Sequence, residues 1–143
     1  MSRTDDVINV AGHRLSTGAI EEVLASHADV AECGVFGIED DLKGELPLGL
    51  VVINASAERN KEELRNELVA LVREKIGAVV AFKLVTVVKR LPKTRSGKIL
   101  RGTMKAIADG KAWKMPATID DPTVLDEITQ SLAELGYPIA TKH

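Results

Sequence analysis

Short blocks of apolar residues along the chain follow two patterns, one typical of strands and one typical of helices. Runs rich in branched side chains predict strands at 7–10, 30–38, 48–53 and 84–88. Residues 11–14 are expected to turn the chain directly into a helix, which Ser16 or Thr17 can cap. Glu21 and Glu22 are expected near the first turn of this helix, where the helix dipole favours negative charge.

The clearest helical pattern covers residues 60–76, where apolar side chains recur every three or four positions: Leu64, Leu68, Leu71, Val72 and Ile76. A further helix is predicted over 99–108, with Gly110 placed to end it. The pair Asp121-Pro122 is typical of a cap followed by proline in the first helical position, and predicts a last helix that continues to Gly136. Strands and helices mix without a strict β-α-β repeat, which favours the α+β class.

Composition limits the chain to one globular core, since it has 143 residues of which 45% are hydrophobic. A net charge of −2 gives little reason to expect attraction to nucleic acid or membranes. The longest apolar runs, at 48–53 and 77–82, are far shorter than the roughly 20 residues of a membrane helix. The opening residues 1–6 do not resemble a leader. Cys33 is the one cysteine, so we expect a buried thiol in a reducing compartment, either the cytoplasm or a mitochondrial matrix.

A basic loop at residues 92–98 is the first candidate for chemistry. It places three cations, two hydroxyls and a glycine between a predicted strand and a predicted helix. Glycine allows close approach of the backbone, hydroxyls donate hydrogen bonds, and lysine carries a mobile charge, so such a loop can bind an anion. It lacks the spacing of a phosphate-binding P-loop. From the residue types alone, a solvated basic turn and an anion site both remain open.

A second candidate is the segment 9–14, where a glycine beside cations precedes a predicted helix. His13 is expected to orient neighbouring groups or to lie at the surface rather than to act as a base. No cluster of cysteine, histidine and aspartate with metal-ligand spacing surrounds it, so no metal site is predicted. On residue type alone, Arg73 in the amphipathic helix is expected to be a surface arginine.

The order and spacing of four segments resemble one protein family across nearly the whole chain. These segments are residues 3–15, 39–45, 72–77 and 91–99, the last with the sequence Leu-Pro-Lys-Thr-Arg-Ser-Gly-Lys-Ile. Together they resemble the C-terminal domain of acetyl- and propionyl-CoA synthetases, which belong to the adenylate-forming superfamily of acyl-CoA synthetases, nonribosomal-peptide adenylation domains and firefly luciferase.

The resemblance implies a small mixed or antiparallel sheet with flanking helices. It implies that residues 1–143 are a single C-terminal domain that begins at the interdomain hinge, with residues 111–143 as an extension carrying one helix. No segment resembles the Gly-, Ser- and Thr-rich phosphate loop of the N-terminal adenylate-binding domain, so that domain is expected to be absent from the chain. Alone, the chain is expected to be inactive.

Enzymes of this family join a carboxylic acid to ATP, release pyrophosphate and pass the acyl group from the adenylate to coenzyme A. By matching position, Lys98 resembles the lysine that stabilises negative charge during adenylation, and Asp5 resembles the hinge residue between two domain poses. The sequence at 11–18 is more similar to the propionyl-CoA branch than to the acetyl-CoA branch. Propionate, or acetate, is therefore the implied acid.

The remaining site residues implied by the resemblance bind the two other substrates. Arg3 and Arg14 resemble residues that contact ATP, Gly12 resembles the glycine that lines the pantetheine tunnel, and Arg73 resembles an arginine that contacts a CoA phosphate. Mg²⁺ is expected in the full-length enzyme but not on this domain. The implied partners are the N-terminal domain of the same polypeptide, CoA, the acyl-adenylate and a lysine acyltransferase or deacylase that acts on Lys98.

Two other kinds of function remain as alternatives. The chain could be a stand-alone module that binds a nucleotide or CoA without catalysis, or an interaction domain that docks through its last helix. Acidic net charge and four aromatic residues, one tryptophan, one tyrosine and two phenylalanines, argue against a nucleic-acid stacking surface. No nucleic-acid or membrane partner is expected.

Overall fold

The computed structural model describes residues 7–10, 12–40, 44–54, 60–77, 82 and 84–137. Within them the chain forms strands and helices in mixed order: β1 (Val7–Val10), β2 (His13–Ser16), α1 (Thr17–Ala25), β3 (Val30–Asp40), β4 (Gly44–Ile53), α2 (Lys61–Lys75), β5 (Leu84–Val88), α3 (Arg101–Asp109) and α4 (Thr123–Glu134). None of the helices in this described part is long and apolar enough to cross a bilayer.

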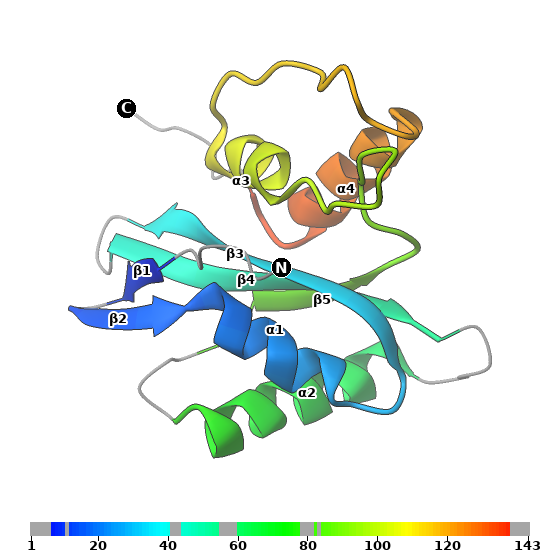
Figure 1. Ribbon diagram of the computed structural model, residues 1–143. Helices are drawn as coiled ribbons and strands as arrows, with labels where there is room; N and C mark the ends of the chain where they lie inside the picture. Colours follow the sequence, from blue (N-terminus) through cyan, green and yellow to red (C-terminus); the bar gives the residue numbers. More distant parts are fainter. Residues whose placement is uncertain are drawn as a thin grey trace.

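Strand β4 is the centre of the sheet. It pairs antiparallel with β3 along its whole length and parallel with β5 between residues 48 and 52. At its first residue, Gly44, it also pairs with Val10 of β1, which in turn forms an antiparallel hairpin with β2. The mixed sheet and its flanking helices confirm the predicted α+β class (Figure 1).

Helices cover both faces of the sheet, α1 and α2 on one side and α3 and α4 on the other (Figure 1). Because successive side chains of a strand point to opposite faces, β3 supplies Val35 to one core and Phe36 to the other. The helix side chains of the first core are Ile20, Leu24, Leu64, Leu68 and Val72. Those of the second core are Met104, Ile107, Ala108, Val124, Leu125, Ile128 and Leu132.

The expected direct turn into the first helix is wrong. Gly12, with φ of +87°, instead reverses the chain so that residues 13–16 return as β2 alongside β1. The sequence of β2, His-Arg-Leu-Ser, contains one apolar residue, whereas the equally short β1 contains three, so β2 has no strand-like apolar pattern to detect. Ser16 does cap α1, since its Oγ accepts from the amide of Ala19 at 3.2 Å. The helix begins at Thr17, so its first turn contains no acidic residue, and Glu21 has a different role described below.

The strand predicted at 48–53 begins earlier, at Gly44, because residues 44–47 pair with the end of β3 although the prediction placed them in a loop. Several helix ends agree with the prediction. Gly110 ends α3 in the left-handed conformation, with φ of 71°, as predicted. The carboxylate of Asp121 accepts from the amide of Thr123 at 3.0 Å, and Pro122 has a helical φ of −63°. Helix α4 begins at Thr123 with Pro122 in the cap position, one residue later than predicted. Cys33 is buried in β3, and its thiol pKa is raised to about 12, first by burial and then by the nearby carboxylate of Glu21.

A cluster of charges at the surface joins the end of β5 to the start of α4. Arg90 donates to both carboxylate oxygens of Glu127, at 3.2 and 2.8 Å, and to Asp121 at 3.1 Å. The pKa of Glu127 is lowered chiefly by its hydrogen bond from Arg90. The pKa of Asp121 is lowered chiefly by hydrogen bonds from Thr123, with Arg90 adding to the effect.

This difference in cause gives a prediction for an Arg90→Met variant. NMR titration should show the pKa of Glu127 returning toward that of a free glutamate, while the pKa of Asp121 stays lowered because Thr123 still donates to it. A carboxyl with a lowered folded-state pKa stabilises the fold above its unfolded pKa, so the cluster should contribute at neutral pH and weaken as pH falls below about 4. An unchanged pKa for Glu127 in the variant would contradict this account.

Candidate functional site

The basic loop forms a tight hairpin, the Lys98 hairpin, made of residues 93–99. Its arms pair at Lys93 and Ile99, and the amide of Thr94 donates to the carbonyl of Lys98 at 2.9 Å. The amide of Gly97 donates to the carbonyl of Thr94 at 2.8 Å, and Gly97 has φ of +93°. This is the arrangement of a short hairpin loop in which a turn is followed by a left-handed glycine. Glycine is therefore required here by the backbone.

Side-chain hydroxyls stabilise the turn from within. The hydroxyl of Thr94 accepts from the amide of Lys98 at 3.1 Å and lies 2.9 Å from the hydroxyl of Ser96. The sequence left open whether these hydroxyls donate to an anion, and the structure shows that the Thr94 hydroxyl orders the loop. In this structure the hydroxyls of Thr94 and Ser96 therefore stabilise the conformation of the hairpin.

The three cations of the loop are in different situations. The ammonium of Lys93 already has a partner within the domain, since it forms a 2.6 Å ion pair with Glu32 of β3. Arg95 and Lys98 are exposed. Within the part of the chain that the structure describes, the ammonium of Lys98 makes no hydrogen bond or ion pair. The predicted catalytic side chain therefore stands on a rigid turn with its charge available.

The other predicted site residues lie elsewhere on the domain. Gly12 and Arg14 are exposed in the β1–β2 hairpin, and Arg73 is exposed near the end of α2. In Figure 1 α2 lies on the opposite side of the sheet from α4, beside which the Lys98 hairpin passes, and the β1–β2 hairpin lies within the sheet itself, at one end of it. The structure does not bring Gly12, Arg73 and Lys98 into one site. Arg3 and Asp5 lie outside the described residues.

A charged pair that the sequence reasoning missed joins α1 to the start of α3, which follows the Lys98 hairpin in the chain. Arg101, the first residue of α3, donates through Nε and Nη2 to the two oxygens of Glu21 at 2.6 and 2.7 Å. Glu21 also accepts from the amide of Val35 at 2.8 Å. The two side chains are only 17% and 13% exposed, so this is a largely buried, two-pronged ion pair. The sequence feature that hints at the burial of Glu21 is its place directly after Ile20, a buried residue of α1, and this hint is recognisable only once the structure is known.

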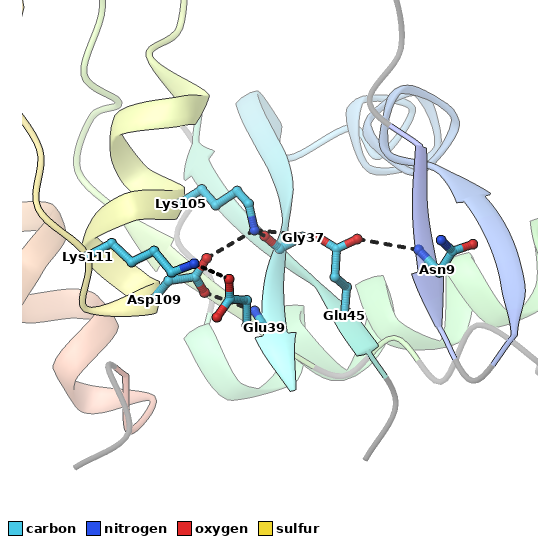
Figure 2. A network of polar contacts seen from close by, with 7 residues as sticks. All are labelled: Asn9, Gly37, Glu39, Glu45, Lys105, Asp109 and Lys111. Atoms are coloured by element: carbon cyan, nitrogen blue, oxygen red, sulfur yellow. Dashed lines mark hydrogen bonds and ion pairs between the residues drawn. The ribbon is translucent and has the colours of Figure 1, made fainter. Parts of the chain in front are cut away.

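A polar network continues along the same edge of the sheet (Figure 2). The ammonium of Lys105 contacts the carbonyl of Gly37 at 2.7 Å, Asp109 at 3.0 Å and Glu45 at 3.4 Å. The other oxygen of Glu45 accepts from the amide of Asn9 in β1 at 3.4 Å. Asp109 accepts from the amide of Glu39 at 2.9 Å, and Glu39 pairs with Lys111. The network connects β1, β3 and β4 with α3.

The described residues contain no group of three or more histidine, cysteine, aspartate or glutamate side chains that could hold a metal ion. A hollow of about 330 Å³ lies between β1 and α3, with Ile8, Phe36, Arg101 and Lys105 among its lining residues. A second hollow of about 460 Å³ lies between the ends of β4 and β5 and helix α4. Neither hollow contains the Lys98 hairpin.

Comparison with known proteins places the chain in a family. Residues 19–98 match the AMP-binding enzyme C-terminal domain. The chain is 53% identical over 128 residues to acyl-CoA synthetase short-chain family member B, mitochondrial, of Dictyostelium discoideum, a match that covers 90% of this chain and 19% of that protein. It is 44% identical over 138 residues to the propionate–CoA ligase of Escherichia coli, covering 94% of this chain and 22% of the ligase.

Solved structures agree with the sequence relatives. The crystal structure of an acyl-CoA synthetase from Brucella canis matches with a TM-score of 0.66 and 32% sequence identity, over 73% of this chain and 19% of that one. The chain spans about a fifth of the length of the curated relatives it matches. By sequence and by fold, the chain belongs to the AMP-binding enzyme C-terminal domain family.

Proposed function

We propose that this chain is the mobile C-terminal domain of an AMP-forming short-chain acyl-CoA ligase that converts propionate, or acetate, to its CoA thioester. Membership of the family and the name of the propionate–CoA ligase relative support the reaction class. The observation that carries the proposal is the exposed ammonium of Lys98 on an ordered hairpin. The pockets for the acid and for adenine would lie on the rest of the polypeptide, with Mg²⁺ accompanying ATP there.

In the first half-reaction, a carboxylate oxygen of the acid attacks the α-phosphorus of ATP, and the bond from that phosphorus to the pyrophosphate oxygen breaks. Negative charge builds on the oxygens of the α-phosphate in the transition state. Lys98 would place its ammonium beside these oxygens and stabilise that charge, with Arg3 and Arg14 contacting the nucleotide. The stabilisation would be large only once the hairpin docks and excludes water, because charges interact weakly in bulk solvent.

In the second half-reaction, the thiol sulfur of CoA attacks the carbonyl carbon of the acyl-adenylate, and AMP leaves. A rotation at Asp5 would withdraw Lys98 and present the opposite side of the domain, where Gly12 and Arg73 lie. A Cβ built on Gly12 would meet no atom within 4 Å, so the domain leaves that position open for a pantetheine arm. Arg73 would meet a CoA phosphate with its exposed guanidinium.

The exposed lysine also offers a site for control. An acyltransferase that neutralises Lys98 would remove the charge on which adenylation depends, and a deacylase would restore it. We propose that residues 1–143 act as one C-terminal domain, with 111–143 as its extension. The cytoplasm, or the matrix of a mitochondrion, is the proposed location.

The role of Lys98 can be tested in the complete polypeptide that carries this chain. Lys98→Ala should lower acid-dependent ATP–pyrophosphate exchange by about 10²–10³-fold, the cost of losing one electrostatic stabiliser. Thioester formation from supplied acyl-adenylate should be largely unchanged. The exposed Lys114 provides a matched control, and Lys114→Ala should leave both rates unchanged. Equal loss of both half-reactions in Lys98→Ala would contradict the division of roles.

The role of Gly12 predicts the reverse pattern. Gly12→Leu should lower thioester formation by about 10²-fold, the effect that misplacing a reacting group by an ångström can have, while pyrophosphate exchange is retained. Gly136→Leu controls for backbone strain, because Gly136 has a similar φ of +95° and equally open surroundings. If the two variants lose thioester formation to the same degree, backbone strain rather than obstruction of the thiol explains the effect.

A further inference from the structure

We propose that residues 116–121, the brace segment, together with Arg90 are positioning elements for Lys98. They hold the Lys98 hairpin at a fixed orientation to the core and so determine where its ammonium arrives. This inference rests on the proposed function, since it concerns delivery of that lysine to a substrate. The brace segment lies outside residues 19–98, the part that matches the family.

The brace segment adds a third strand to the two arms of the hairpin. The amide of Arg95 donates to the carbonyl of Thr118 at 2.9 Å, and the amide of Asp120 donates to the carbonyl of Lys93 at 2.8 Å. Between these bonds, Thr94 and Ile119 form an antiparallel bridge. The hairpin is therefore held along one side by backbone hydrogen bonds, which allow less movement than contacts between exposed side chains.

The brace segment is itself anchored in the core. The side chain of Ile119 is only 6% exposed and packs in the core that α3 and α4 share. One residue after the brace bonds, Asp121 caps α4 through the amide of Thr123. Movement of the hairpin away from the brace would thus break bonds to a segment that cannot follow it without disturbing α4.

Arg90 fixes the other end of the same arrangement. It lies two residues before Pro92, whose carbonyl accepts from the amide of Leu100 at 2.9 Å and closes the base of the hairpin. Its guanidinium holds Asp121 and Glu127 together, as described above. Through Arg90, the chain entering the hairpin is therefore tied both to the end of the brace segment and to α4.

The expected consequence is specific to one half-reaction. A hairpin fixed only at its base can tilt, and a tilt displaces the tip that carries Lys98 more than any other part. Because catalysis by a positioned charge is sensitive to displacements of about an ångström, loss of the brace should impair adenylation. It should not impair thioester formation, in which Lys98 has no proposed part.

The sharpest test compares Arg95→Pro with Arg95→Ala in the complete polypeptide. Both variants lack the guanidinium, but only proline lacks the amide that donates to Thr118. Proline suits the second position of a turn, and the residue before it, Thr94, is already in a bridge, so the turn itself should persist. We expect pyrophosphate exchange about five- to tenfold lower in Arg95→Pro than in Arg95→Ala, the effect of one typical hydrogen bond. Thioester formation from supplied adenylate should be equal in the two.

A second pair of variants removes the clamp without touching the hairpin. Arg90→Met removes an exposed cation with carboxylate partners, and Lys111→Met removes another, paired with Glu39 far from the hairpin in sequence. Arg90→Met should lower exchange and speed amide deuterium uptake at residues 93–99 and 118–120, whereas Lys111→Met should do neither. Unfolding midpoints measured in parallel separate a shift of the hairpin from general loss of stability.

The outcomes are decisive in either direction. Equal exchange rates in Arg95→Pro and Arg95→Ala would overturn the proposal. If Arg95→Pro loses both half-reactions and its unfolding midpoint also falls, that variant has lost general stability, and the comparison of Arg90→Met with Lys111→Met decides. If those two variants then show the same exchange rate and the same deuterium uptake, the proposal is overturned. Lys98→Ala is measured alongside. If it retains exchange, the proposed function fails, while deuterium uptake in Arg90→Met still shows whether the brace holds the hairpin.

Discussion

Burial of β4 on both faces is the constraint on which the rest of the domain depends. Leu48 and Leu50 point into the core beneath α3 and α4, whereas Val51 points into the core beneath α1 and α2. At Gly49 a Cβ would lie 3.1 Å from the ring of Phe82 and 3.3 Å from Leu24, so the packing there leaves little room for a side chain. Because both faces of β4 are covered, its backbone groups cannot bond to water and must pair with strands along both edges.

The partners of β4 connect the two functional ends of the chain. Strand β1, the first described element after Asp5, pairs with Gly44 at the start of β4. Strand β5, which leads to the Lys98 hairpin, pairs with its second half. Under the proposed function, a rotation at the hinge is therefore transmitted to the hairpin through one rigid strand rather than through flexible loops. Such an arrangement favours movement of the whole domain as one body over separate movement of the hairpin.

Strand β3 borders the sheet within the described residues, and charged side chains cover its free edge. The amide of Val35 donates to Glu21, the carbonyl of Gly37 accepts from Lys105, and the amide of Glu39 donates to Asp109. The backbone amides and carbonyls of alternate residues point to the same edge of an antiparallel strand, so at these three positions they point away from β4. An unpaired edge invites pairing with another chain. The carboxylates and ammonium satisfy these groups and also tie α1 and α3 to the sheet, which explains why Glu21 and Arg101 are buried as a pair.

The sequence predicted those features that arise from neighbouring residues, and missed those that depend on distant ones. Helix α2 and the end of α3 at Gly110 follow from local spacing and backbone freedom, and the pattern was clear. Strand β2 was missed because it has a single apolar residue, Leu15, whereas the equally short β1 has three. The pair Glu21–Arg101 joins residues 80 positions apart, and nothing local in either residue indicates the other. The pairing of Thr94 with Ile119 was missed for the same reason. Lys98 could be singled out only by resemblance, since the residue types of the loop alone favoured a solvated turn over an anion site.

The contrast between two lysines of one hairpin shows how the site can be both rigid and reactive. Lys93 is half-buried, with its side chain 32% exposed, and its ammonium pairs with Glu32 of β3. That pair fixes the base of the hairpin but leaves the Lys93 ammonium unavailable to a ligand. The ammonium of Lys98 stays exposed to water, because the turn and the brace segment order its backbone rather than its side chain. The ammonium therefore loses its water only when a substrate anion replaces it, and in the proposed reaction that is the moment at which its charge is needed.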